Sequence, residues 1–213
     1  MTGPAIKICG IRTAPALDAA ITAGADHAGF VFFPPSPRHV SLADAASLGA
    51  RAAGRIGHVG LFVDAADDLI GEAVAAAGLD AIQLHGSETP ERAAQVRARC
   101  GLPVWKALSV ASAADVSRAA AYAGAADLVL FDAKTPKGTL PGGMGLSFDW
   151  GLVARWNGPL AWGLAGGLTP DNVGEAVRLT GAPLVDTSSG VESAPGIKDV
   201  DLIAAFCRAV RKP

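Results

Sequence analysis

Short runs of β-branched and other apolar residues recur along the chain, and each is followed by an alanine-rich stretch typical of a helix. The runs start 22 to 33 residues apart, which suits one strand plus one crossover helix, so the spacing predicts parallel strands. The eight predicted strands are Ala5–Cys9, His27–Phe32, His58–Val63, Ala81–His85, Pro103–Leu108, Asp127–Asp132, Leu160–Leu164 and Pro183–Thr187.

Residues at the ends of the predicted helices supply start and stop signals. Thr89-Pro90 and Thr169-Pro170 each place an N-cap residue before a proline at the first helical position. Ser41 and Asp44 have the spacing of a capping box, with aspartate in place of the usual glutamate. Four glycines follow helical runs, where a left-handed C-cap is favoured: Gly24, Gly78, Gly101 and Gly181.

Eight strand–helix units within 213 residues match the lower size range of a (β/α)8 barrel. We therefore predict an α/β fold, a parallel eight-stranded TIM barrel that spans residues 1–213 as a single domain. An open doubly wound sheet is the main alternative, but such sheets seldom contain eight evenly spaced units.

Two connections are longer than the others and follow the second and sixth predicted strands. Their sequences are "FFPPSPRHVS" and "AKTPKGTLPGGMGLSFDW". Both follow the carboxyl ends of strands, which is the face on which barrel enzymes build their sites. Proline and glycine make both connections non-helical, and the pair Gly142-Gly143 would suit a mobile lid.

The alternation of side chains along a strand predicts which residues face the barrel interior. In the first strand Ile6 and Ile8 take the apolar face towards the helices. Lys7 and Cys9 then point inward, with Cys9 at the rim and Gly10 leaving space beside the thiol. The same alternation turns four more polar residues inward: Gln83, His85, Asp132 and Asp186.

Two lysines are predicted to lie slightly deeper than this rim, because the alternation turns both Lys7 and Lys106 inward and Trp105 outward. Unpaired charges would be costly there, so we expect lysine–aspartate pairs. A polar layer whose groups only satisfy one another is the simpler alternative. The gathering of these groups at the rim where barrels do their chemistry favours a functional site.

The last two strand–helix units supply a candidate anion site. Gly166-Gly167 lies between the seventh strand and a helix N-terminus, and Ser188-Ser189-Gly190 follows the eighth strand. Backbone N–H groups in such loops, together with a helix dipole, can hold a phosphate. Glycine pairs also serve ordinary turns, but the loops after strands seven and eight are the usual phosphate location in barrels.

Composition excludes several classes of partner. Half of the residues are hydrophobic, 18% are charged and the net charge is −2, so no charge pattern points to nucleic acid or to a membrane surface. No apolar run approaches the ~20 residues that a membrane span needs, and the first strand begins too early to leave room for a secretory signal. The three cysteines suggest neither a disulfide framework nor a zinc motif, and the histidines lack ligand spacing. We expect a cytoplasmic protein with reduced thiols and no bound metal.

Several of these segments together resemble a known family. The segments "KICGIR", "FFPPSPRHV", "QLHG", "LFDA", "GGMGLSFDW", "LAGGL" and "DTSSGVE" are similar to the successive motifs of the phosphoribosylanthranilate isomerases. The resemblance runs in order from residue 6 to about residue 192. It implies an Amadori rearrangement of a phosphorylated aminosugar in tryptophan biosynthesis, in a monomer or a homodimer.

The resemblance also implies roles for individual residues. Asp132 would be the general acid that protonates the furanose ring oxygen, and Cys9 the general base that removes the C2′ proton. Arg38 would hold the anthranilate carboxylate, in a geometry open to bidentate pairing. The phosphate would lie against Gly166, Gly167, Ser188, Ser189 and Gly190, and the remaining substrate contacts would come from Lys7, Gln83, His85 and Asp186.

The implied chemistry agrees with the residue types. A free thiol has a pKa near ~8.5, so Cys9 is a suitable base only where its environment favours thiolate, and neighbouring Lys7 is a candidate for that bias. Asp132 must carry a proton in order to donate it. No redox or metal step occurs, so no cofactor is needed. Two residues depart from the family pattern: Met144, where threonine is usual, and Thr187, where valine is common.

Three other functions remain as alternatives. An indole-3-glycerol-phosphate synthase would be expected to use lysine and glutamate at strand ends, and a ribulose-phosphate epimerase two facing aspartates with metal-binding histidines. A barrel that only binds a phosphorylated ligand would need no acid and base on opposing strands. The pairing of Cys9 with Asp132 favours the isomerase over all three.

Overall fold

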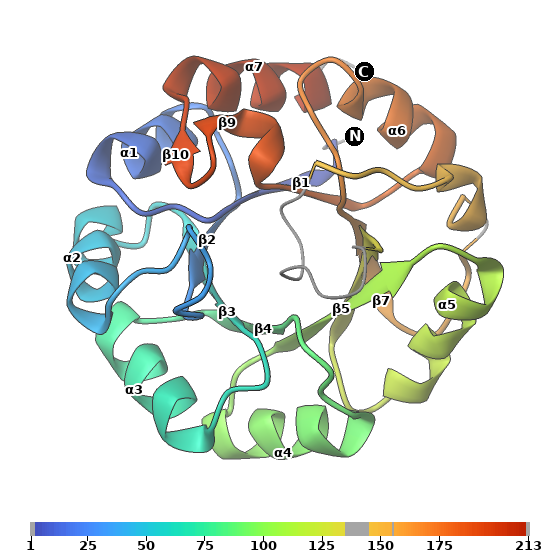
Figure 1. Ribbon diagram of the computed structural model, residues 1–213, viewed down its shortest axis with the longest axis horizontal. Coiled ribbons are helices and arrows are strands. Elements are labelled where there is room, and N and C mark those ends of the chain that lie inside the picture. The colour runs from blue at the N-terminus through green and yellow to red at the C-terminus, as the bar shows by residue number, and fades with distance from the viewer. Residues whose placement is uncertain (1–2, 135–144, 155, 212–213) are drawn as a thin grey trace.

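Eight parallel strands close into a barrel in the computed structural model, which describes residues 3–134, 145–154 and 156–211 (Figure 1). The barrel strands, in the order in which they neighbour one another, are β1 (Ala5–Cys9), β2 (His27–Val31), β3 (Gly57–Phe62), β4 (Ala81–Leu84), β5 (Val104–Val110), β6 (Leu128–Ala133), β7 (Ala161–Leu164) and β8 (Leu184–Thr187). The predicted barrel is confirmed, and each predicted strand begins and ends within two residues of the observed one.

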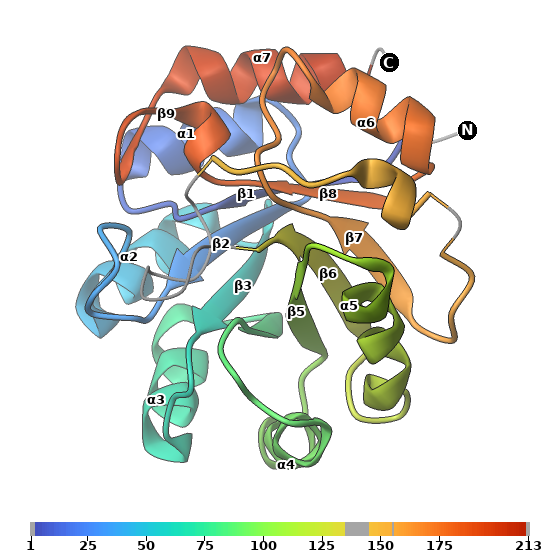
Figure 2. The same cartoon turned by 45° about the vertical axis from the view of Figure 1, so that its right-hand side comes forward.

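Helices surround the barrel as an outer ring. They are α1 (Ala14–Thr22), α2 (Leu42–Ala52), α3 (Asp67–Ala77), α4 (Pro90–Cys100), α5 (Ala113–Ser117) with the 3₁₀ helix η1 (Arg118–Tyr122), α6 (Val173–Thr180) and α7 (Val200–Arg211). Figure 2 shows α7 beside α6 and α1, where it covers β1 and β8. Between β6 and β7 the described residues form only the 3₁₀ helix η2 (Trp150–Leu152). The predicted lid pair Gly142-Gly143, and Met144, lie outside the described residues.

Two of the three predicted helix starts are confirmed. The Ser41 hydroxyl accepts a hydrogen bond from the Asp44 N–H at 3.0 Å, and α4 begins at Pro90 behind its Thr89 cap. The prediction at Thr169-Pro170 is wrong, because α6 begins at Val173.

A polar side chain explains the late start of α6. Asn172 accepts a hydrogen bond from the Thr169 N–H at 2.8 Å, and its amide group donates to the Gly167 carbonyl at 2.9 Å. These bonds fold residues 167–172 back as a turn. The helix therefore starts beyond the turn, and Gly167 is fixed in the loop that follows β7.

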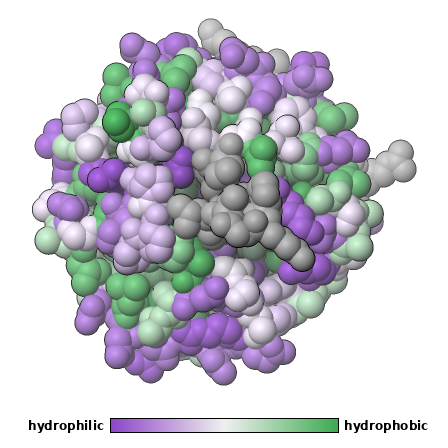
Figure 3. Space-filling model, viewed as in Figure 1, coloured by the Kyte–Doolittle hydropathy of each residue, from purple (hydrophilic) through white to green (hydrophobic). Residues whose placement is uncertain are grey.

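The core has an outer and an inner layer. Strand residues such as Ile6, Ile8 and Val129 pack outward against the helices, while hydrophilic side chains spread around the outer surface of the ring (Figure 3). The barrel interior holds a separate apolar plug below the polar rim, made of Val59, Ala81, Trp105, Ala107, Leu130 and Leu184.

The predicted orientation of β5 is wrong. Trp105 is aligned with Gln83 on β4 and belongs to the interior plug, whereas Lys106 is aligned with Leu84 and Val129 on the outward face. A carboxylate outside the barrel explains this arrangement, because the Lys106 ammonium lies 2.9 Å from Glu88 in the loop after β4. Lys106 is therefore part of the support of that loop and not of the site.

Among the described residues, no helix is long and apolar enough to cross a membrane.

Candidate active site

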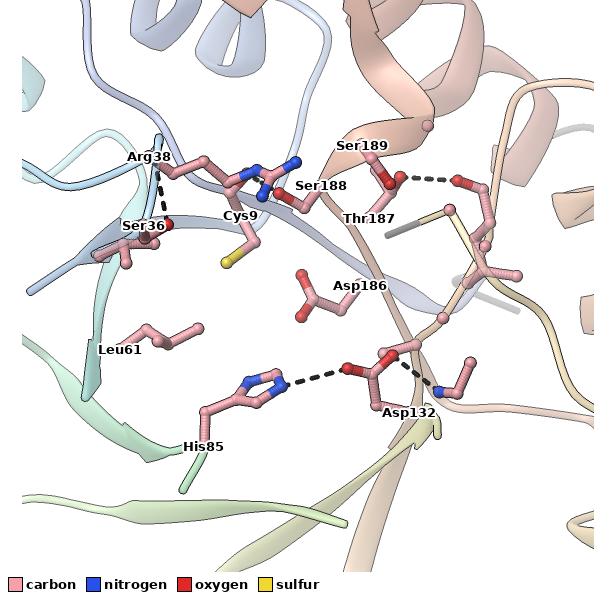
Figure 4. Close-up of a pocket in the computed structure, with 18 of the residues that line it drawn as sticks. Cys9, Ser36, Arg38, Leu61, His85, Asp132, Asp186, Thr187, Ser188 and Ser189 are labelled. Atoms are coloured by element: carbon pink, nitrogen blue, oxygen red, sulfur yellow. Dashed lines mark hydrogen bonds and ion pairs between the residues drawn. The ribbon is translucent and has the colours of Figure 1, made fainter. Parts of the chain in front are cut away.

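A cavity opens at the carboxyl ends of the barrel strands, on the face predicted for the site (Figure 4). Ten of the twelve residues predicted to form the site line it: Cys9, Arg38, His85, Asp132, Gly166, Gly167, Asp186, Ser188, Ser189 and Gly190. The other two, Lys7 and Gln83, are fully buried on the inner faces of β1 and β4. The structure therefore brings together side chains from strands far apart in the sequence.

Lys7 and Asp186 form an ion pair beneath the cavity. The Lys7 ammonium lies 3.0 Å from both carboxylate oxygens of Asp186, the neighbouring residue on β8. Burial lowers the pKa of Lys7, but the interactions with Asp186 and Cys9 outweigh it, and the pKa is raised. Lys7 therefore stays charged, and the expected lysine–aspartate pairing is confirmed for this lysine.

The Cys9 thiol points from the end of β1 into the cavity, and 5% of the residue is exposed (Figure 4). Burial raises its pKa, and Asp186 adds to that rise. Lys7 and Lys198 act in the opposite direction without cancelling it. Lys7 thus acts in favour of the thiolate, but burial outweighs it and the pKa of the thiol stays above its ordinary value.

A chain of three side chains links β4 to β6 on the opposite side of the cavity. The Gln83 amide nitrogen lies 3.0 Å from Nδ1 of His85, and Nε2 of His85 lies 3.1 Å from Oδ2 of Asp132. With the amide in this orientation Gln83 donates to Nδ1, so the ring proton sits on Nε2 and faces Asp132. Oδ1 of Asp132 accepts the Ala133 N–H at 2.8 Å. Both oxygens of Asp132 are therefore held in fixed positions, with His85 at the atom that could exchange a proton.

The loops after β7 and β8 meet at one side of the cavity. Thr187 donates a hydrogen bond to the Leu168 carbonyl at 2.7 Å, and a Cβ atom on Gly190 would collide with that same carbonyl oxygen. Gly166 and Gly167 both have φ values in the left-handed region, which glycine adopts without strain. The absence of side chains at these glycines leaves the backbone of both loops accessible to a ligand in the cavity.

Arg38 reaches the cavity from the loop that follows β2. Its Nε and one terminal nitrogen donate to the two oxygens of Glu192 at 2.8 and 2.7 Å. A bidentate pair with a substrate carboxylate would therefore have to use other N–H groups of the guanidinium. Gly10 makes room for this side chain, because a Cβ atom there would lie 2.7 Å from Cδ of Arg38.

The described residues include no group of three or more histidine, cysteine, aspartate or glutamate side chains that could hold a metal ion.

Comparison with known proteins agrees with this arrangement. The family model for N-(5'-phosphoribosyl)anthranilate isomerase matches residues 6–209. The chain belongs to the N-(5'-phosphoribosyl)anthranilate isomerase family. A relative of that name from Paramagnetospirillum magneticum is 55% identical over 207 residues, which cover 97% of this chain and 96% of the relative.

Solved structures of the same family have the same fold. The phosphoribosylanthranilate isomerase of Thermotoga maritima is 34% identical, with a TM-score of 0.88 over 99% of this chain and 100% of that one. A phosphoribosylanthranilate isomerase solved in complex with reduced 1-(o-carboxyphenylamino)-1-deoxyribulose 5-phosphate is 32% identical, with a TM-score of 0.86 over the same shares.

Three residues that lie beside the cavity lining were not identified from the sequence. Glu192 and Lys198 come from a hairpin after β8, and Gly29 lies beside Cys9 on β2. Glu192 stands within the quoted motif "DTSSGVE", and the alternation of β2 turns Gly29 inward, so both carried a signal. Lys198 carried none. Thr187 is one of the two residues that depart from the family pattern. Its hydroxyl links the loops that follow β7 and β8.

Proposed function

We propose that this protein catalyses the isomerisation of N-(5-phosphoribosyl)anthranilate to 1-(2-carboxyphenylamino)-1-deoxyribulose 5-phosphate in tryptophan biosynthesis. The observation that carries the proposal is the position of two groups on opposite sides of one cavity: the Cys9 thiol on β1 and the Asp132 carboxyl on β6 (Figure 4). An aldose-to-ketose rearrangement needs one group to donate a proton to the ring oxygen and another to remove a proton from carbon.

The first step opens the sugar ring. Asp132 gives its proton to the furanose ring oxygen, the bond between that oxygen and C1′ breaks, and the anthranilate nitrogen supplies the electron pair that forms a Schiff base at C1′. For this step Asp132 must first carry a proton on Oδ2. Nε2 of His85, 3.1 Å away, can accept from it once the ring proton is on Nδ1 and the Gln83 amide presents its oxygen to that N–H. Gln83 and His85 are proposed to hold the carboxyl in this position.

The second step moves the double bond. The Cys9 thiolate removes the C2′ proton, and its electron pair forms an enolamine between C1′ and C2′ while the nitrogen becomes neutral. Transfer of the C2′ hydroxyl proton and protonation of C1′ then give the ketone. C2′ is oxidised as C1′ is reduced within one molecule, so the reaction is an intramolecular oxidoreduction and needs no cofactor.

The remaining residues are proposed to hold the substrate. The phosphate lies against the backbone of Gly166, Gly167, Ser189 and Gly190, where small residues leave N–H groups accessible. Ser188 contributes through its backbone, because its hydroxyl donates to the Cys9 carbonyl at 3.1 Å. Arg38 holds the anthranilate carboxylate. Lys7 and Asp186 form the charged floor beneath the sugar.

We also infer the domain organisation, the cellular compartment and the oligomeric state. We infer a single-domain protein of the cytoplasm, because its three cysteines are all free, as expected of a reducing compartment. It works as a monomer or as a homodimer, and sedimentation at micromolar concentration distinguishes the two.

The loss of substrate fluorescence tests the assigned roles. The wild type should turn over N-(5-phosphoribosyl)anthranilate, and Cys9→Ala and Asp132→Asn should each lose about 10²–10⁴-fold in kcat. Both substitutions are close in size to the original residue, so unchanged thermal unfolding would confirm that the fold is intact. Full activity in either variant would overturn its assigned role, and a wild type without turnover would overturn the proposed function.

A further inference from the structure

A small hairpin follows the phosphate loop, and the proposed reaction gives it no role. It consists of β9 (Glu192–Ala194) and β10 (Ile197–Lys198), preceded by the 3₁₀ helix η3 (Ser189–Val191). Glu192 and Lys198 are register partners in the hairpin, and their side chains are 4% and 2% exposed. Two charged side chains are thus buried together next to the site.

Every proton of the Lys198 ammonium is used. Its nitrogen lies 2.7 Å from Oε1 of Glu192, 2.8 Å from the Ser188 carbonyl and 3.2 Å from the Ser188 hydroxyl. Three donated bonds require the charged form of lysine. The Ser188 hydroxyl in turn donates a hydrogen bond to the Cys9 carbonyl. Lys198 is therefore connected through Ser188 to the end of β1 that carries the thiol.

Glu192 connects this lysine to Arg38. Oε1 accepts from both Lys198 and Nε of Arg38, and Oε2 accepts from a terminal nitrogen of Arg38. The Gly196 N–H donates the fourth hydrogen bond to this carboxylate, at 3.2 Å from Oε2. The carboxylate therefore has no freedom to rotate while both cations are in place, and it fixes the plane of the guanidinium.

The turn of the hairpin also holds the chain that carries Arg38. A Cβ atom on Gly196, which has a φ of 80°, would collide with the Pro37 carbonyl oxygen. The same oxygen accepts a hydrogen bond from Arg12 at 2.8 Å. The backbone immediately before Arg38 is thus held from two sides.

Charge gives Lys198 a second effect. An arginine paired with one glutamate has no net charge, and such a pair attracts a carboxylate weakly. With Lys198 included, the cluster of two cations and one anion carries a net charge of +1 in a buried setting, where the interaction with an anion is little screened.

We propose that Lys198 is a positioning residue that, through Glu192, holds Arg38 in orientation and charge for the substrate carboxylate. The inference rests on the proposed function, in which Arg38 is the carboxylate anchor. Lys198 should therefore control selectivity for the carboxylated ring, although it is not among the residues that line the cavity.

The test compares two ligands on each variant. One is reduced 1-(o-carboxyphenylamino)-1-deoxyribulose 5-phosphate, and the other is the same molecule without the ring carboxylate. Lys198→Met should weaken binding of the carboxylated ligand about 10-fold or more, the scale of a lost buried charge interaction, and change the affinity for the other by less than about 2-fold. In turnover, KM should rise more than kcat falls. Lys198→Arg, which keeps the charge, should restore part of the preference.

Each outcome decides the proposal. Equal weakening of both ligands by Lys198→Met would mean a purely structural role, and unchanged affinity for both would mean no role; either overturns it. Lys198→Gln, which keeps two N–H donors but no charge, replaces Lys198→Met if that variant does not fold, with the same expected selectivity. Arg38→Met must lose the same preference, since otherwise Lys198 has nothing to position. A wild type that neither turns over the substrate nor binds either ligand defeats the proposed function itself.

Discussion

Gly29 on β2 lies directly beside Cys9 on β1, and the two residues are register partners in the barrel. A Cβ atom built on Gly29 would lie 3.0 Å from the Cys9 sulfur and 3.1 Å from the Lys7 ammonium nitrogen. Such distances are shorter than ordinary van der Waals contact, so the proposed base has room only because position 29 has no side chain.

Gly29→Ala should therefore displace the thiol without unfolding the barrel. We expect kcat to fall about 10–10²-fold with little change in KM, because misplacement of a reacting group by about 1 Å is costly in rate. Steady-state kinetics and thermal unfolding give the two readouts. Gly71→Ala is the matched control, since a Cβ atom there meets nothing within 4 Å and Gly71 lies within α3. It should leave kinetics unchanged and stabilise the protein by about 0.5–1 kcal/mol. Wild-type kinetics in Gly29→Ala would show that the thiol does not need its present position.

The raised pKa of Cys9 predicts the pH dependence of the reaction. Burial raises the pKa of the thiol, and the proposed base is the thiolate, so kcat/KM should rise with pH through and beyond the ordinary thiol pKa of ~8.5. The charged groups that act on Cys9 are Lys7 on β1, Asp186 on β8 and Lys198 on β10. Because Lys198 lowers the pKa of the thiol, Lys198→Met should shift the rise of kcat/KM to higher pH.

Alkylation by iodoacetamide provides an independent measurement of the same pKa, with Cys9 identified by mass spectrometry. The rate at Cys9 should follow the same pH midpoint as kcat/KM. Cys207 serves as the internal reference, because burial raises its pKa to about 11 and its alkylation rate should keep rising up to that pH. A Cys9 midpoint below that of free cysteine would contradict the prediction.

The strands and their inward residues could be predicted because local rules determine them. The regular spacing of apolar runs locates the strands, and strict alternation places Cys9 and Asp132 on the same inner surface. The pair of Lys7 with Asp186 also follows, because a buried lysine needs an anion and the first and eighth strands of a closed barrel are neighbours.

What could not be predicted depends on contacts between distant segments. Arg38 and Glu192 are 154 residues apart, and nothing local indicates that they pair. The predicted orientation of β5 was wrong for the same reason. Either face can hold a lysine if a carboxylate lies near it, and Glu88 in the preceding loop could not be placed from the sequence.

The Lys106–Glu88 pair should therefore matter for stability and not for chemistry. Lys106→Met leaves a buried carboxylate without its cation, and we expect a loss of about 3–5 kcal/mol in the free energy of unfolding, measured in urea. Adding Glu88→Leu should recover only part of this loss. Glu88 also accepts the N–H groups of Asp64 and Gly86, and the double variant would lose both hydrogen bonds, each of which contributes about 0.5–1.5 kcal/mol. Complete recovery in the double variant would show that these two bonds contribute little.

Removal of the other buried lysine should make stability depend on pH in a defined direction. Lys7→Met leaves Asp186 buried without its partner, and we expect a loss of about 3–5 kcal/mol at neutral pH. Burial already raises the pKa of Asp186, and loss of the ammonium raises it further. A carboxyl whose pKa in the folded protein exceeds its unfolded value of ~3.9 favours the folded state at low pH, and that gain is lost as the pH rises through the folded pKa.

The difference in unfolding free energy between wild type and Lys7→Met should therefore shrink as the pH falls from 8 towards 4, in urea titrations at each pH. The double variant Lys7→Met/Asp186→Asn has no ionisable group at either position, so its difference from Lys7→Met should vanish at low pH and grow at high pH. A deficit in Lys7→Met that stays constant across this range would mean that the variant is destabilised by altered packing, and that the charge left on Asp186 contributes nothing to the loss.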